Sequence, residues 1–142
     1  MHFTSQQRLD DGSLEREFTL GEIPGIVWTP GSAAAPVPLI LLGHPGGLRA
    51  MYPRLVGRAR RSAKEGFATA TIELPGSGDR PRSPDAEQAR ADLHRALTAG
   101  EPVDEIVDRL LLPLVEKAVP EWQTTLDALL SLPEIGGPVG YS

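Results

Sequence analysis

The segment "VPLILLGH" (37–44) constrains the fold most, because it carries apolar residues on both faces. A strand with this pattern must be buried on both sides, and such strands occur in parallel sheets that helices cover. The run "FATATIELPG" (67–76) has the same character and ends in proline and glycine. Between the two, residues 51–66 place apolar side chains at helical spacing, and Gly66 ends that pattern. Two buried strands joined by one helix predict a βαβ unit and an α/β fold.

The residues before this unit predict antiparallel strands. "LEREFTL" (14–20) alternates apolar and charged residues, which is typical of a half-exposed strand. "IPGIVWTP" (23–30) predicts a second strand, broken or bulged around Pro24 and Gly25. We therefore expect a mostly parallel sheet whose first strands are antiparallel.

The residues after the unit predict three helical pieces and one further strand. Residues 85–118 form a helical stretch in two pieces, and a third helix begins after Pro120. "VGYS" (139–142) then begins another buried strand. The stretch 85–118 also fits a helical cap inserted into the fold. Its apolar residues either line an acyl or alcohol pocket or pack on the sheet as core; they are Leu110, Leu111, Leu112 and Val115.

Charge and composition exclude several classes of function. The 142 residues are enough for one domain but not clearly for two, and the net charge is −5. An acidic chain argues against nucleic acid or an anionic membrane as partner, and we interpret the basic run "RARR" (58–61) as a solvated helix face. The absence of cysteine excludes disulfides, thiolate catalysis and zinc–thiolate sites. With no apolar leader and no apolar run of about 20 residues, we expect a cytoplasmic protein.

Two glycine-rich turns follow the two buried strands. In "LLGHPGGL" (41–48) the glycines let backbone N–H groups point at an anion. A phosphate is the alternative anion, but neither nucleotide-binding fingerprint is present, so we expect no cofactor and no metal. "ELPGSGDRPR" (73–82) predicts a tight turn, with a local ion pair between Asp79 and Arg80 as the alternative.

The segment "VGYS" supplies a nucleophile candidate. It matches the first half of G-x-S-x-G, in which a small residue, any residue and then serine stand at the end of a buried parallel strand. In that motif a sharp turn exposes the serine hydroxyl at the carboxyl edge of the sheet. The helix that follows offers its N-terminus to an oxyanion.

Over nearly its whole length the chain resembles the amino-terminal half of the α/β-hydrolase superfamily. Within it the chain is most similar to dienelactone-hydrolase-like proteins and bacterial serine esterases. "LLGHPGG" resembles the oxyanion loop after the third strand of that family, "GFATATIELPGSGDRPR" its fourth strand and following loop, and "PVGYS" the entry to the nucleophile elbow.

The resemblance assigns roles to five residues. It makes Ser142 the catalytic nucleophile. Since Pro45 has no N–H to donate, it points to the backbone of Gly46, Gly47 or Leu48 as the oxyanion hole. It gives His44 the role of bracing that loop, with the role of base as the alternative.

In this family the acid and the histidine follow the serine, and here nothing follows Ser142. His2 is expected to be solvated and His94 to lie at the surface. We therefore expect residues 1–142 to be an incomplete domain of a cleaved or split chain, inactive alone. A second polypeptide would supply the remaining strands, the acid and the histidine. It would also cover the open apolar edge of a sheet whose last strand is central.

The function that the resemblance implies is hydrolysis of a small carboxylic ester by a serine esterase. One alternative is a non-catalytic module of the same fold that binds or scaffolds. Another is a different acyl-transfer or C–C hydrolase reaction, because a fold does not determine its chemistry.

Overall fold

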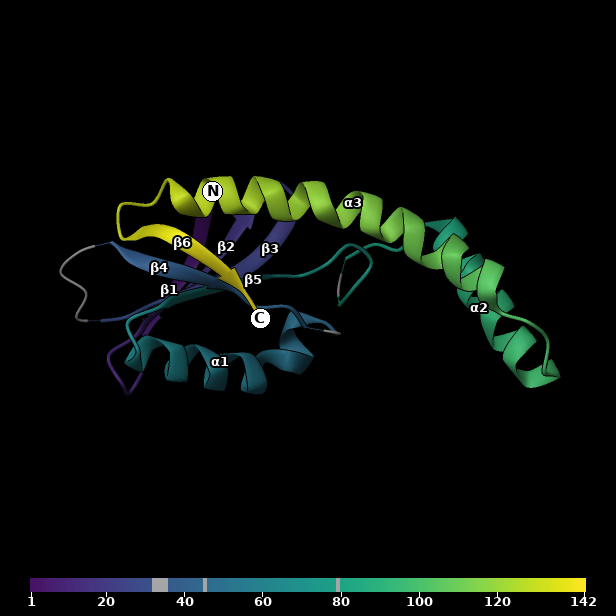
Figure 1. Ribbon diagram of the computed structural model, residues 1–142, viewed down its shortest axis with the longest axis horizontal. Helices are drawn as coiled ribbons and strands as arrows, with labels where there is room; N and C mark the ends of the chain where they lie inside the picture. The colour runs from purple at the N-terminus through teal and green to yellow at the C-terminus, as the bar shows by residue number, and fades with distance from the viewer. Residues whose placement is uncertain (32–35, 45, 79) are drawn as a thin grey trace.

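The computed structural model describes residues 1–31, 36–44, 46–78 and 80–142. Within these residues the chain forms one mixed sheet and three helices (Figure 1). The elements are β1 (His2–Arg8), β2 (Leu14–Leu20), β3 (Ile23–Thr29), β4 (Val37–Leu41), α1 (Leu48–Lys64), β5 (Ala68–Ile72), α2 (Pro84–Ala99), α3 (Asp104–Leu130) and β6 (Ile135–Tyr141).

The six strands lie in the order β1-β2-β3-β5-β4-β6. β1, β2 and β3 pair antiparallel, and β3 is antiparallel to β5. β5, β4 and β6 run parallel to one another. The α/β fold class is confirmed, but three of the five pairings described are antiparallel, which corrects the expected mostly parallel sheet. The difference comes from β1, an edge strand whose exposed polar residues carry no apolar pattern.

Two helices cover the two faces of the sheet, as Figure 1 shows with α1 on one side and α3 on the other. Under α1, Leu55 and Ala59 pack against Trp28 and Leu42. Under α3, Leu129 packs against a larger cluster that includes Phe18, Val27, Leu39 and Ile72. β4 and β5 are therefore covered on both faces and paired on both edges, as their sequences predicted.

Strand β3 is continuous, which corrects the expected break at Pro24 and Gly25. Its pairing with β2 runs without interruption from Ile23 to Thr29. Gly25 has a packing role instead, because a Cβ there would lie 2.3 Å from the ring of Phe18.

Helix α3 is also continuous, although it contains Pro113 and Pro120. The sequence predicted two helices with a boundary at Pro120. Each proline removes one backbone N–H donor, but contacts on both sides of Pro120 hold the helix. Before it, α3 packs on α2; after it, Trp122 and Leu129 pack on the sheet.

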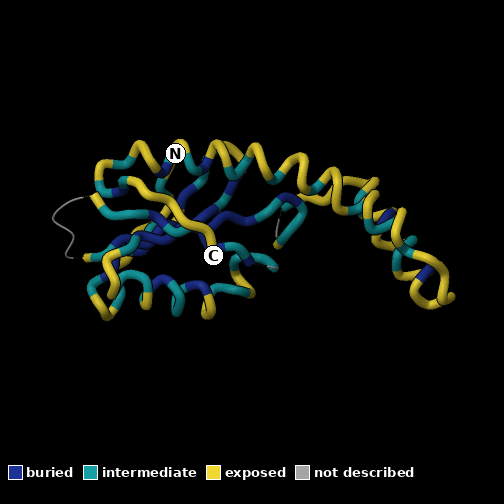
Figure 2. The backbone as a smooth tube through the Cα atoms, viewed as in Figure 1, coloured by how far each residue is buried: buried dark blue, intermediate teal, exposed yellow. Residues whose placement is uncertain are grey.

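The first half of α3 projects beyond the sheet together with α2 (Figure 1). Figure 2 shows that this projection is largely exposed. Leu111, Leu112 and Val115 are 46%, 60% and 53% exposed, so these three do not pack on the sheet as core. Leu110 is half-buried. Among the described residues, no helix is long and apolar enough to cross a membrane.

Strand β6 lies at an edge of the sheet and pairs with β4 alone among the described strands. Ile135 is buried, but residues 137–141 are exposed. An open edge at the last strand is what the sequence led us to expect of residues 1–142, and burial of that strand by further strands stays a prediction. A strand with one neighbour keeps its outer edge in solvent, whatever its apolar content.

Candidate active site

Ser142 continues the parallel pairing beyond the end of β6. Its N–H donates to the carbonyl of Leu41 at 2.9 Å, and its carbonyl accepts from the N–H of Gly43 at 2.8 Å. A Cβ on Gly43 would lie 2.3 Å from the hydroxyl of Tyr141, so a larger residue there would displace the end of that exposed side chain. The candidate nucleophile therefore lies beside the first residue of the loop that joins β4 to α1. We call residues 43–48 the candidate oxyanion loop.

The side chain of Ser142 contacts a residue of the basic run 58–61, for which the sequence predicted no role at the site. Arg58, on α1, donates a hydrogen bond of 2.6 Å from Nη2 to the Ser142 Oγ. Arg58 also lies 3.4 Å from the carbonyl of Gly43. The interpretation of 58–61 as a solvated face is thus wrong for Arg58, which is half-buried.

His44 ties the candidate oxyanion loop to β5. Its Nε2 lies 2.8 Å from the carbonyl of Ile72, and because a carbonyl only accepts, Nε2 carries the proton. His44 as a whole residue is 9% exposed. His2 and His94 are exposed, as expected, although His2 lies in β1 rather than in an unpaired terminus. Among the described residues, Ser142 has no histidine as a hydrogen-bond partner.

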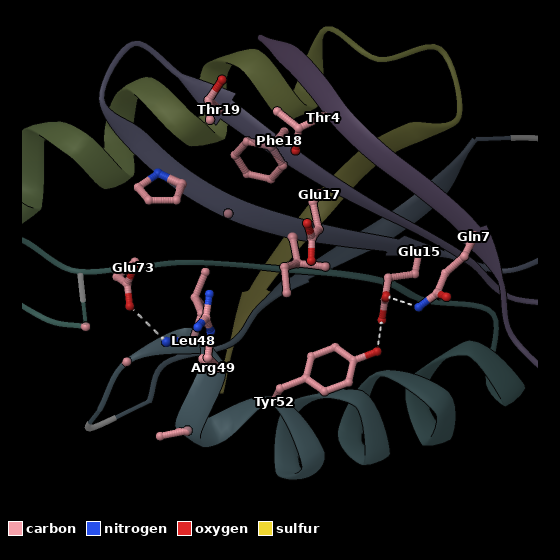
Figure 3. Close-up of a pocket in the computed structure, with 16 residues that line it drawn as sticks. Thr4, Gln7, Glu15, Glu17, Phe18, Thr19, Leu48, Arg49, Tyr52 and Glu73 are labelled. Atoms are coloured by element: carbon pink, nitrogen blue, oxygen red, sulfur yellow. Dashed lines mark hydrogen bonds between the residues drawn. The ribbon is translucent and has the colours of Figure 1, made fainter. Parts of the chain in front are cut away.

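The N–H of Leu48 is already hydrogen-bonded. It donates to Oε1 of Glu73 at 3.0 Å, at the point where α1 begins (Figure 3). Gly47 is the N-cap of α1. Pro45 lies outside the described residues. Of the three expected donors, Gly46 and Gly47 remain once Leu48 is engaged.

Glu73 is a residue of this site that the sequence did not predict. It follows β5 directly and is 8% exposed. The signal was an acidic residue at the end of a fully buried strand, where a charge needs partners. Arg80 donates to the carbonyl of Glu73 at 2.9 Å and forms a two-bond ion pair with Glu121 on α3. The sequence suggested Asp79 as the ion-pair partner of Arg80. Asp79 lies outside the described residues, and the partner that the structure describes is Glu121.

A cavity of about 940 Å³ lies next to the candidate oxyanion loop rather than at Ser142 (Figure 3). It extends from Gly47, Leu48 and Glu73 along α1 to Glu15 and Tyr52. Ser142 does not line it. Ser142 and this cavity thus border different residues of the loop, because Ser142 pairs with Gly43 whereas Gly47 and Leu48 line the cavity. The candidate site is therefore defined by the hydrogen bonds of Ser142.

Comparison with known proteins identifies the fold. No protein-family model and no curated protein matches the sequence. The PEG-bound structure of a cold-adapted esterase from an Arctic intertidal metagenomic library is similar, with a TM-score of 0.61 and 24% identity. That match covers 99% of this chain and 54% of the other.

Two further structures support the same fold. The native form of that esterase gives a TM-score of 0.57 at 21% identity, over 99% of this chain and 52% of the other. The hypothetical protein PA2218 from Pseudomonas aeruginosa gives 0.51 at 14% identity, over 95% of this chain and 36% of the other. This chain spans about half the length of the two esterase chains. Together with the strand order and the βαβ unit, these matches confirm the predicted resemblance: the chain has the α/β-hydrolase fold.

Proposed function

We propose that the protein is a serine hydrolase of carboxylic esters and that Ser142 is its nucleophile. The observation that carries the proposal is the pairing of Ser142 with Leu41 and Gly43 at the carboxyl edge of the parallel strands. In open α/β sheets, ligands bind at that edge. The fold shared with esterase structures supports an ester as the substrate.

In the proposed reaction, Ser142 Oγ attacks the carbonyl carbon of the ester and gives its proton to a base. The carbonyl oxygen becomes an oxyanion, which the N–H groups of Gly46 and Gly47 stabilise. Collapse of the tetrahedral intermediate expels the alcohol and leaves an acyl group on Ser142, and water then releases the acid.

Arg58 is compatible with this role of Ser142. A hydroxyl has one hydrogen to donate and two lone pairs that accept. Arg58 uses a lone pair, so the Ser142 hydrogen stays available to a base. A guanidinium beside Oγ also favours the negative charge that develops during attack.

The base and its acid are proposed to come from a second polypeptide, or from a further part of the same protein. His44 uses Nε2 for Ile72, and His2 and His94 are exposed on β1 and α2. The outer edge of β6 offers a place for a further strand, because Val139 and Tyr141 are 38% and 71% exposed beside it. Intact-mass measurement tests the pairing, since a single active species of 15.2 kDa without a partner would rule it out.

Hydrolysis of a nitrophenyl ester by the complete protein, including the part that supplies the base and its acid, tests the nucleophile. Replacing the nucleophile of a serine hydrolase lowers kcat by up to about 10⁶-fold, so Ser142→Ala should abolish measurable turnover. Ser131→Ala, at the exposed end of α3, is the matched control and should keep full activity. A fluorophosphonate probe should label the wild type and not Ser142→Ala. Equal rates of ester hydrolysis in the wild type and Ser142→Ala would remove Ser142 from the mechanism.

A non-catalytic binding module is the second candidate function. It is favoured by the contact of Ser142 Oγ with Arg58 rather than with a histidine. Such a module would bind an ester analogue without reacting with the fluorophosphonate probe. The same labelling experiment therefore separates the two functions.

A further inference from the structure

We infer that Glu73 is a positioning residue for the candidate oxyanion loop, and that the Arg80–Glu121 ion pair holds Glu73 in place against α3. The inference rests on the proposed function. Glu73 contacts the loop through its side chain and the ion pair through its backbone carbonyl. It therefore stands between the loop and the helix that covers the opposite face of the sheet.

The side chain of Glu73 caps α1 from outside the helix. The N-cap residue, Gly47, has no side chain to accept from the first N–H groups. Oε1 of Glu73 accepts from Leu48 in its place, at 3.0 Å. A carboxylate at this position also interacts favourably with the positive end of the helix dipole. Figure 3 shows the Glu73 side chain directed at the backbone of Leu48.

Two glycines make room for the carboxylate. A Cβ on Gly47 would lie 3.0 Å from Oε1 of Glu73, and a Cβ on Gly78 would lie 1.8 Å from it. Gly78 also has a φ of +55°, which a larger residue adopts only with strain. The loops after β4 and β5 therefore leave a closely fitting space that the Glu73 carboxylate occupies.

Arg80 fixes the backbone of Glu73. Its Nη1 donates to the Glu73 carbonyl at 2.9 Å, and its guanidinium donates to both Glu121 oxygens at 2.6 and 2.9 Å. The Arg80 and Glu121 side chains are only 7% and 14% exposed. Two parallel bonds from a guanidinium set the geometry more closely than a single contact. The chain of contacts thus runs from α1 through Glu73 and Arg80 to α3.

This arrangement has a specific consequence for catalysis. Donors to an oxyanion must be held in place before the reaction, and a misplacement of about 1 Å can cost about 10²-fold in rate. Glu73 engages Leu48 and so leaves Gly46 and Gly47 to serve the oxyanion. Loss of the anchor should therefore lower kcat and leave KM nearly unchanged, because the oxyanion contacts that it positions form only in the transition state.

The test compares Glu73→Ala and Glu73→Gln with the wild type, each as the complete protein with the part that supplies the base. Glu73→Ala should lower kcat about 10²-fold with KM nearly unchanged. Glu73→Gln should restore most of the rate, because an amide oxygen still accepts from Leu48. Glu65→Ala, at the exposed far end of α1, is the control and should leave kcat unchanged.

Amide hydrogen exchange at Leu48 is the second readout, and it does not depend on activity. Exchange should accelerate in Glu73→Ala and in Glu121→Gln, and stay slow in Glu73→Gln. Unchanged exchange and unchanged kcat in Glu73→Ala would overturn the inference while the proposed function stands. If the wild type hydrolyses no ester, the catalytic role falls with the proposed function, and exchange decides the anchoring role.

Discussion

Tyr52 donates a hydrogen bond of 2.6 Å to Oε1 of Glu15, and the same oxygen accepts from Nε1 of Trp28 at 2.7 Å. Gln7 donates to the other carboxylate oxygen at 2.5 Å. These residues come from α1, β2, β3 and β1, so one carboxylate joins the helix to three strands. Figure 3 shows its bonds to Tyr52 and Gln7. Glu15 is 4% exposed. A buried carboxylate is tolerated when hydrogen bonds satisfy it, and these three donors do so.

Replacing Glu15 should therefore destabilise the protein. Glu15→Ala leaves the donors of Trp28 and Tyr52 without their acceptor, and an unsatisfied buried group costs about 1–3 kcal/mol. We expect a loss of about 2–5 kcal/mol in the free energy of unfolding, measured by urea denaturation. Glu17→Ala changes an exposed residue on the same strand and should stay within about 0.5 kcal/mol of the wild type. Equal losses in the two variants would contradict the role of Glu15.

The contact with Glu15 also affects the ionisation of Tyr52. Burial, followed by the hydrogen bond to Glu15, raises the pKa of Tyr52 to about 12. In the unfolded chain tyrosine ionises at about pH 10. Because the folded pKa is the higher one, this stabilisation is present below about pH 10 and is lost as the pH rises to about 12.

Absorbance titration of the tyrosinate band measures this pKa. The wild type should show an ionisation step at about pH 12 that Tyr52→Phe lacks. Tyr141→Phe, which removes the other of the two tyrosines, should keep that step. If Tyr141→Phe loses the step near pH 12 and Tyr52→Phe keeps it, the assignment to Tyr52 is wrong.

The ion pair between Arg16 and Glu134 predicts a loss of stability in acid. It joins β2 to the residue before β6. Burial raises the pKa of Glu134, but the hydrogen bond and the charge of Arg16 outweigh it and hold the pKa below its usual value. A depressed carboxyl pKa stabilises the fold above the unfolded pKa of about 4.3, and this contribution is lost as the pH falls through the folded pKa.

Glu134→Gln should therefore lower the free energy of unfolding at neutral pH and converge with the wild type in acid. Urea denaturation at a series of pH values measures the difference. Arg16→Gln removes the other partner and should show the same convergence. A difference that stays constant from neutral to acid pH would show that the pair does not cause the effect.

Two leucines of α3 should differ sharply in their contribution to stability. Leu129 is fully buried against the sheet, whereas Leu112 is 60% exposed on the projecting half of the helix. Truncating a buried leucine costs about 2–5 kcal/mol, so Leu129→Ala should be strongly destabilising. Leu112→Ala should change the unfolding midpoint little, since surface changes stay within about 0.5 kcal/mol. A large loss in Leu112→Ala would mean that the projecting half of α3 is covered in the protein.

The sequence predicted the centre of the fold well. β4 and β5 carry continuous apolar runs and α1 has a clear helical period, so their elements and their burial follow from local pattern. At the carboxyl edge of the parallel strands Ser142 lies beside Gly43, the first residue of the glycine-rich loop, while the role of that loop as an oxyanion hole stays a prediction. These features are predictable because parallel strands bring their carboxyl ends together.

Other features depended on the tertiary structure. β1 has no apolar pattern and is held by its pairing with β2, and α3 passes through two prolines because packing on both sides holds it. The contacts of Glu73 with Leu48 and of Arg58 with Ser142 join residues 25 and 84 positions apart. Sequence periodicity reports which face of an element is apolar. It carries no information on which distant polar group satisfies another, because that pairing is decided only when the elements pack together.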